Sequence, residues 1–136
     1  MKAIADTGFL VAFANRRDKH HAWALDVAQR ITEPALTCDA VLAESAFHIQ
    51  DAALVLAFVK LGLVRPVFQM EENLERLAEL AERYADRTPD LADLCLIRMS
   101  ELHPKYPVLT TDRKDFSVYR RGRREMIPLV CPPARR

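Results

Sequence analysis

The sequence predicts an α/β protein with a mainly parallel central sheet. The alternation of its segments and its length support this prediction, and its glycine content excludes two classes of nucleotide-binding loop. Short apolar runs of the length of buried strands alternate with longer segments of helical periodicity. The chain contains only three glycines, so a glycine-rich phosphate or dinucleotide loop cannot be formed. Its 136 residues, half of them hydrophobic, are enough for one buried core. We therefore expect one domain over residues 1–136, in which residues 131–136 form a flexible tail.

The predicted strands are short, and most are followed at once by a polar residue and a helical pattern. The first is the apolar run that ends at Ala5, and the second covers residues 35–38. Residues 63–68 fit an edge strand, because Pro66 has no N–H to donate to a neighbouring strand. Residues 108–110 and 126–130 are the last two predicted strands.

The predicted helices lie between these strands. They cover residues 7–16, 21–31, 40–48, 52–61 and 71–86, and a further helix opens at residues 88–90. Asp39 and Asp51 precede apolar periodic segments and are expected to cap their helices. The segment 71–86 is the clearest amphipathic helix. Its expected inner face consists of Leu74, Leu77, Leu80, Ala81 and Tyr84.

Composition and charge exclude several classes of protein. The formal net charge is +1, so no global field favours nucleic acid or membrane, although basic residues gather in segment 113–136. Three cysteines far apart in the sequence favour neither a disulfide framework nor a zinc site, and they fit a reduced compartment. The longest uncharged apolar run covers residues 52–59, whereas a helix that crosses a bilayer needs about 20 apolar residues. We expect a cytoplasmic protein without a membrane contact.

Four carboxylates stand where a parallel sheet brings distant segments together. Asp6 follows the first strand, and Glu44 lies in the first turns of the helix after the second strand. Asp112 follows the third clear strand, and Asp93 lies near the start of a helix, one turn after Asp90. Strand ends and helix starts meet at one edge of a parallel sheet, so these side chains are expected to converge.

Such a cluster of carboxylates predicts a site for a hard cation. Carboxylates that lie close together repel one another and resist full ionisation, unless a cation neutralises them. Ligands that are oxygen only favour Mg²⁺ or Mn²⁺, with water and substrate phosphate completing the coordination. An ion of this kind activates water and neutralises the charge that develops on a phosphodiester. The cluster therefore predicts hydrolysis of a phosphodiester bond.

Four parts of the chain resemble, in order and at the right length, the motifs of the PIN domain, in particular its bacterial VapC-like toxin branch. They are residues 4–10 (IADTGFL), Glu44 after a strand, residues 90–97 (DLADLCLI) and residues 109–116 (LTTDRKDF). The resemblance implies a three-layer α/β/α sandwich and a metal-dependent endoribonuclease, the toxin of a toxin–antitoxin pair. It also implies an RNA substrate, a cognate antitoxin and a homodimer. The chain departs from the commonest family pattern at Leu94 and Cys95, where small residues are more usual.

The resemblance also implies roles for single residues. The family's catalytic acidic metal ligands fall on Asp6, Glu44, Asp93 and Asp112. Its polar positioning residues fall on Thr7 and Thr110.

The polar residues around these motifs have several interpretations. Asp90 either caps its helix, which we favour, or joins the site through water, because it lies one turn from Asp93. Asp115 is interpreted as part of a charged turn, His48 as a packed or hydrogen-bonded side chain, and the pair His20–His21 as a helix start. Basic residues that are candidates for binding RNA phosphates are Arg113, Lys114, Arg120 and Arg121.

Three other functions are alternatives to the nuclease. A phosphatase of the haloacid-dehalogenase type needs a second aspartate two residues after the first, and that position is Gly8. A receiver-type phosphoacceptor needs an acidic pair after the first strand, and Ala5–Asp6 is not one. The stronger alternative is a PIN-like module without catalysis that binds RNA or protein.

Overall fold

A five-stranded parallel sheet forms the centre of the computed structural model, which describes residues 1–134. Its strand order is β3–β2–β1–β4–β7, and every pairing in it is parallel. The strands are β1 (Ile4–Ala5), β2 (Ala35–Thr37), β3 (Val64–Pro66), β4 (Val108–Leu109) and β7 (Leu129–Val130). The predicted parallel sheet is confirmed, and β3 lies at its edge as Pro66 indicates.

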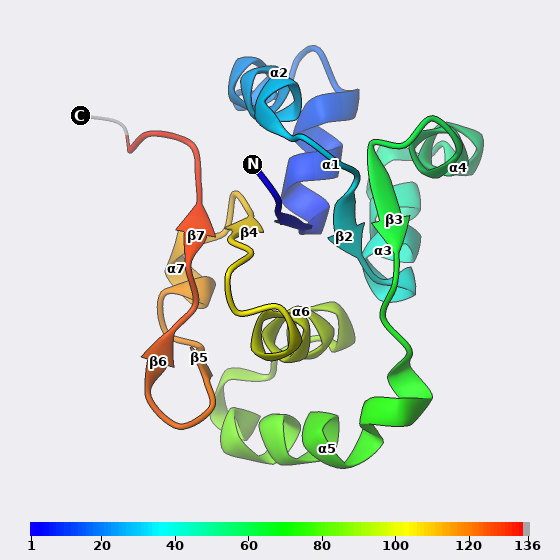
Figure 1. The fold of residues 1–136 in the computed structure, drawn as a ribbon. Coiled ribbons are helices and arrows are strands. Elements are labelled where there is room, and N and C mark those ends of the chain that lie inside the picture. The colour runs from blue at the N-terminus through cyan, green and yellow to red at the C-terminus, as the bar shows by residue number, and fades with distance from the viewer. Residues whose placement is uncertain (135–136) are drawn as a thin grey trace.

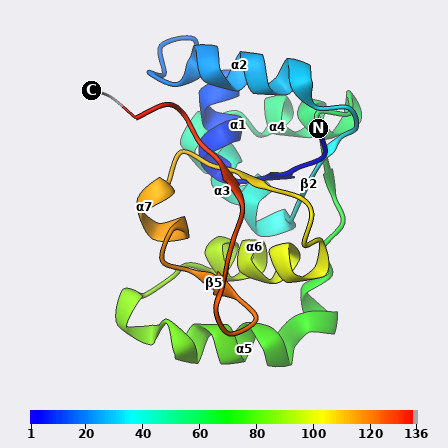
Figure 2. The same ribbon diagram turned by 60° about the vertical axis from the view of Figure 1, so that its left-hand side comes forward.

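Helices cover both faces of this sheet. Figures 1 and 2 show α2 on one side of the sheet and α6, then α5, on the other, which confirms the three-layer sandwich. The helices are α1 (Thr7–Ala14), α2 (His21–Arg30), α3 (Asp39–Ile49), α4 (Ala52–Lys60), α5 (Leu74–Arg83), α6 (Leu91–Leu102) and α7 (Arg113–Phe116). None of these described helices has the length and hydrophobicity that crossing a bilayer requires.

The C-terminal region differs from the predicted single strand over residues 126–130. Only β7 joins the central sheet, whereas β6 (Glu125–Met126) pairs antiparallel with β5 (Arg120–Arg121) in a separate hairpin. Pro128 lies between β6 and β7 and lacks the N–H that a continuous strand would use. Residues 131–134 lie outside the helices and strands, and the rest of the expected tail, residues 135–136, lies outside the described residues.

The predicted helix over residues 71–86 is divided into three pieces. A 3₁₀ turn (Met70–Asn73) precedes α5, and a second 3₁₀ turn (Ala85–Arg87) follows it. Leu74 is 57 % exposed, so its assignment to the inner face was wrong. Leu74 is the first residue of α5, whereas Leu77 and Leu80 are buried.

Two predicted helix caps have different outcomes. Asp51 is confirmed, because its Oδ1 accepts a hydrogen bond of 2.9 Å from the N–H of Leu54. Asp39 is not a cap: Cys38 holds the N-cap position, and Asp39 is the first residue of α3. Its negative charge there still suits the positive end of the helix dipole.

The packed core fixes the positions of the strand ends. Ile4, Leu36 and Val108 are buried neighbours across the three middle strands. Leu94 and Cys95, at which the sequence departs from the family pattern, are both buried in this core. The carboxyl ends of β1, β2 and β4 therefore deliver their following residues to one edge of the sheet.

Candidate metal centre

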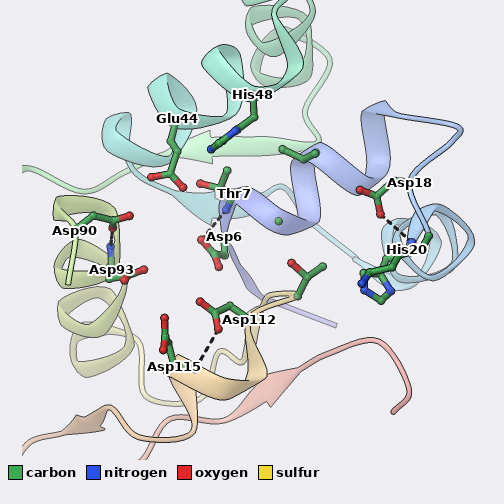
Figure 3. A pocket seen from close by; sticks show the side chains of 14 residues that line it. Asp6, Thr7, Asp18, His20, Glu44, His48, Asp90, Asp93, Asp112 and Asp115 are labelled. Atoms are coloured by element: carbon green, nitrogen blue, oxygen red, sulfur yellow. Dashed lines mark hydrogen bonds between the residues drawn. The ribbon is translucent and has the colours of Figure 1, made fainter. Parts of the chain in front are cut away.

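A cleft of about 500 Å³ lies at this edge of the sheet. Seven carboxylates line it, and Figure 3 shows them arriving from different elements around one opening. The structure brings the four predicted acidic residues together here. The seven are Asp6, Asp18, Glu44, Asp90, Asp93, Asp112 and Asp115.

Asp6 is the most deeply held of these carboxylates. It follows β1 directly and caps α1, with Oδ1 accepting a hydrogen bond of 2.7 Å from the N–H of Thr7. Its Oδ2 accepts a hydrogen bond of 2.6 Å from the hydroxyl of Thr110. Burial, together with the charges of Glu44 and Asp112, raises the pKa of Asp6 to about 6, although both hydrogen bonds oppose this.

Asp112 is tied to the same hydroxyl group. Its backbone N–H donates to Thr110 Oγ1 over 2.9 Å, and its Oδ1 accepts from the N–H of Asp115 over 3.0 Å, which caps α7. Burial and the charge of Asp115 raise the pKa of Asp112. Asp115 itself lines the cleft, so its interpretation as only a charged turn was wrong.

Glu44 faces the cleft from α3, opposite the start of α6. Asp90 caps α6, as predicted, because its Oδ1 accepts a hydrogen bond of 2.8 Å from the N–H of Asp93. Its side chain nevertheless lines the cleft. Burial and the charge of Asp90 raise the pKa of Glu44 and raise the pKa of Asp93 to about 7.

Tyr119 is a contact of the site that no sequence motif indicated. Its hydroxyl donates a hydrogen bond of 3.2 Å to Oδ2 of Asp93, and its ring is 1 % exposed. The ring packs edge-on against Tyr84 and Phe116. Tyr119 thus joins the acidic cleft to the core below it.

The PIN domain family model matches residues 3–122. This chain belongs to the PIN domain family. The solved structure of Mycobacterium tuberculosis VapC20, described as a toxin that cleaves the sarcin–ricin loop, is similar with a TM-score of 0.66 at 20 % identity. The match covers 78 % of this chain and 86 % of that one. No curated protein sequence matches the chain. The family match and the structural match confirm the fold that the sequence motifs predicted.

The donors of this PIN domain fit a hydrated divalent cation. Within residues 1–134, no three acidic, histidine or cysteine side chains lie close enough to hold one ion by themselves. Hard cations such as Mg²⁺ keep several waters and take few carboxylates, which suits oxygen donors spread around a cleft. The hydroxyl of Thr7 is buried at the cleft close enough to Glu44 to lower its pKa, but among the described residues it makes no hydrogen bond of normal geometry. A bound water or substrate oxygen would satisfy it.

Three further side chains of the cleft were not predicted. Lys19 and His20, from the loop between α1 and α2, line it together with His48. His20 does precede the start of α2, as expected for a helix start. His48 is exposed on the wall of the cleft, with its ring edge-on to Phe47, so it is not a packed core residue.

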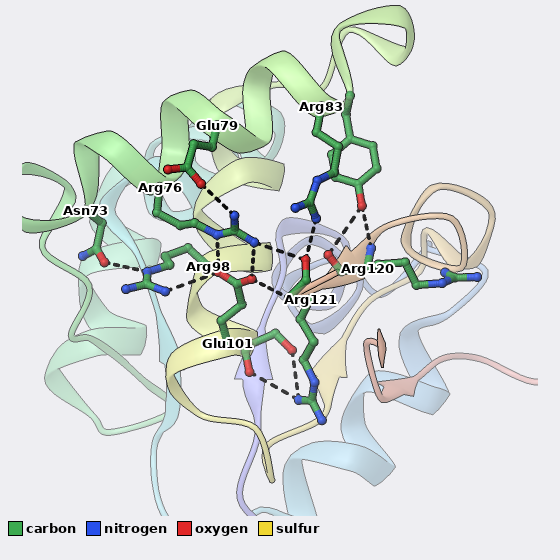
Figure 4. A network of polar contacts seen from close by, with 11 residues as sticks. Asn73, Arg76, Glu79, Arg83, Arg98, Glu101, Arg120 and Arg121 are labelled. Atoms are coloured by element: carbon green, nitrogen blue, oxygen red, sulfur yellow. Dashed lines mark hydrogen bonds and ion pairs between the residues drawn. The ribbon is translucent and has the colours of Figure 1, made fainter. Parts of the chain in front are cut away.

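Two basic residues of the C-terminal hairpin, Arg120 and Arg121, are engaged within the protein (Figure 4). Arg121 is 8 % exposed, donates to the carbonyl of Pro104 over 2.6 Å, and pairs with Glu125. The expectation that Arg121 contacts RNA was therefore wrong, because its guanidinium is used to hold the hairpin. Arg120 donates from Nη1 to three backbone carbonyls, including that of Ser117.

Arg113 and Lys114 differ from the two hairpin arginines. Both are exposed on α7, directly after the cleft residue Asp112. They therefore remain candidates for contact with RNA phosphates.

Proposed function

We propose that this PIN domain is a metal-dependent endoribonuclease that hydrolyses RNA phosphodiester bonds, and that it is the toxin of a toxin–antitoxin pair. The observation that carries the proposal is the convergence of Asp6, Glu44, Asp93 and Asp112 at one cleft, from four separate parts of the chain. Membership of the PIN domain family and the similarity in fold to VapC20 support it.

The four carboxylates would hold Mg²⁺ or Mn²⁺, as one ion or two. A bound ion of this type activates water for attack and neutralises charge that develops on the phosphodiester. Thr110 and the N–H of Thr7 fix both oxygens of Asp6, so this ligand needs no rearrangement before catalysis. The unpartnered hydroxyl of Thr7 would orient a water or a phosphate oxygen.

The electrostatics of the cleft set the order of binding. Seven carboxylates repel the phosphates of RNA. Burial, and to a smaller extent repulsion among the carboxylates, raises the pKa values of Asp6 and Asp93. RNA would therefore enter only after a cation has bound. A purely RNA- or protein-binding module would have no use for this cluster, whose repulsion costs stability.

Partners and compartment follow from the same proposal. The substrate is RNA, the inhibitor is a cognate antitoxin protein, the active form is a homodimer, and the compartment is the cytoplasm. The similarity to a toxin structure supports the first two of these.

The decisive test is incubation of the purified protein with total RNA and Mn²⁺, followed by mapping of the cut ends. Cleavage should occur with Mn²⁺ or Mg²⁺ and stop in EDTA. Asp112→Asn should abolish it, whereas Asp26→Asn, which removes an exposed carboxylate on α2 outside the cleft, should not. Equal cleavage in EDTA, or by Asp112→Asn, would show that the carboxylates hold no catalytic metal.

A further inference from the structure

One side of the acidic cleft carries a cationic side chain. Lys19 is the only lysine or arginine among the described residues that line the cleft, and His20 lies beside it. Figure 3 shows Asp18 and His20 across the opening from Asp90 and Asp93, with Asp6 between the two sides. A substrate bound at the central carboxylates would therefore meet a carboxylate wall in one direction and the α1–α2 loop in the other.

The loop is held in place by its own hydrogen bonds. Asp18 Oδ1 accepts from the N–H of His20 over 2.8 Å, and the carbonyl of Asp18 accepts from the N–H of His21 over 3.0 Å. His21 Nδ1 lies 2.7 Å from the carbonyl oxygen of Ala12 in α1. Asn15 Oδ1 accepts a further bond from the loop backbone. The backbone that presents Lys19 is thus ordered before any ligand arrives, which lowers the entropy cost of binding.

The charge of the loop suits a polyanion. Arg16, Arg17 and Lys19 are all exposed, and Asp18 is the one carboxylate among them. Asp18 accepts a loop hydrogen bond, whereas Lys19 has none of the described carboxylates within ion-pair distance. Its ammonium group is therefore free to contact a phosphate at the cleft.

We propose that the α1–α2 loop is the phosphate-binding side of the cleft, and that the RNA strand runs from the carboxylates past Lys19 and His20. This inference rests on the proposed function. A cation held by the central carboxylates would neutralise a phosphodiester bound there, but the neighbouring phosphates of the strand need another positive group. Lys19 supplies it at the cleft, because Arg113 and Lys114 are not part of the cleft lining and the guanidinium of Arg121 is buried in the hairpin.

Arg17 provides a matched control for the test. It lies in the same loop, carries the same charge and is exposed, but it does not line the cleft. Lys19→Ala and Arg17→Ala therefore change the net charge equally and differ in position. The first readout is binding of a fluorescein-labelled oligouridine in Mg²⁺ over a series of KCl concentrations, and a gel checks that the oligouridine stays intact. The second readout is cleavage of total RNA.

Lys19→Ala should weaken oligouridine binding by about fivefold and reduce the salt slope by about 0.7 to 1, as loss of one phosphate contact predicts. Arg17→Ala should leave both values near those of the wild type, and cleavage by Lys19→Ala should fall through a raised KM. Equal losses in the two variants, or none in Lys19→Ala, would overturn the inference. Wild-type protein that binds but never cleaves would refute the proposed function instead, while the binding comparison would still decide the role of the loop.

Discussion

The hydroxyl of Thr110 donates a hydrogen bond of 2.6 Å to Oδ2 of Asp6, a residue 104 positions earlier in the chain. The same hydroxyl oxygen accepts a hydrogen bond from the N–H of Asp112 over 2.9 Å. Thr110 is fully buried, so water does not compete for either bond. One hydroxyl group thus sets the relative positions of two of the four candidate metal ligands.

Replacing Thr110 with valine should therefore disturb both stability and activity. The N–H of Asp112 and Oδ2 of Asp6 each lose a partner, which should lower the free energy of unfolding by about 1–3 kcal/mol. RNA cleavage should fall, since the two carboxylates lose their common anchor. Urea denaturation and a cleavage assay check the two effects. Thr110→Ser keeps the hydroxyl and should stay close to wild type in activity, so equal losses in both variants would contradict this role.

Asp6→Asn should abolish RNA cleavage and at the same time relieve the charge repulsion that destabilises the metal-free protein. The amide can still accept from the N–H of Thr7, and its Nδ2 can donate to the hydroxyl oxygen of Thr110, but it carries no charge to repel Glu44 or Asp112. We expect RNA cleavage to be lost while the Tm in EDTA rises at about pH 8, where Asp6 is ionised. Differential scanning calorimetry and the cleavage assay measure these changes. An active Asp6→Asn variant would remove Asp6 from the set of ligands.

Stability of the metal-free protein should fall as pH rises from about 4 to about 7. In the folded state the pKa values of Asp6 and Asp93 are about 6 and about 7, against 3.8 in the unfolded chain. In this window the folded state holds protons that the unfolded state has already released, so rising pH favours unfolding. For Asp6, which is 7 % exposed, the effect is on the order of 3 kcal/mol.

The Tm is measured across this pH range, first in EDTA and then, after the chelator has been removed, with Mg²⁺ added. Mg²⁺ should restore stability chiefly at the alkaline end, where the carboxylates are free to bind it. The Asp6→Asn, Asp93→Asn double variant should lose most of the pH dependence. If its pH dependence matches that of the wild type, other groups control the stability.

The positions of most strands and of the carboxylates along the sequence were predictable because they depend on local pattern. Asp6 ends an apolar run and Asp90 starts a helical one, and a parallel sheet brings such ends together whatever the details of packing. The contributions of Lys19, Asp115 and Tyr119 were not predictable in this way. Their roles depend on how a loop, a short helix and a core aromatic ring pack around the cleft, and no spacing in the sequence encodes that packing.

The sequence also did not predict which of the hairpin arginines is buried. A basic cluster at positions 120–124 has the composition of a solvated surface, and the sequence pattern does not distinguish its members. Burial of Arg121 follows from contacts with Ser100, Pro104 and Glu125, two of which lie 17 and 21 residues away. Only the packing of the hairpin against the end of α6 reveals it.

Gly8 should tolerate no side chain, because of its contact with Thr111. A Cβ at Gly8 would lie 2.1 Å from Thr111 Oγ1 and 3.1 Å from its Cβ. Gly8→Ala should therefore displace the residue between Thr110 and Asp112, costing about 1–3 kcal/mol and reducing cleavage. Adding Thr111→Ala removes the closest atom and should restore part of both losses. A double variant no better than Gly8→Ala, measured by urea denaturation and cleavage, would point to another cause.

The partly buried ion pair between Arg76 of α5 and Glu101 of α6 should contribute more to stability than an exposed ion pair. Arg76 donates to both oxygens of Glu101, over 2.9 and 2.6 Å, and the N–H of Gly122 donates to the same carboxylate over 2.7 Å (Figure 4). Burial raises the pKa of Glu101, but these hydrogen bonds outweigh it and hold the pKa below its ordinary value. The carboxylate therefore joins α5, α6 and the hairpin as an anion.

Glu101→Ala should lower the free energy of unfolding by about 2–4 kcal/mol, because it leaves the guanidinium of Arg76 and the N–H of Gly122 without their partner. The matched control is Asp26→Ala, which breaks an i,i+4 pair with Arg30 whose side chains are 66 % and 55 % exposed. That change should cost less than about 0.5 kcal/mol. Urea denaturation of both variants measures the difference. Comparable losses would show that the hairpin is held by apolar contacts such as those of Tyr119, and that the ion pair adds little.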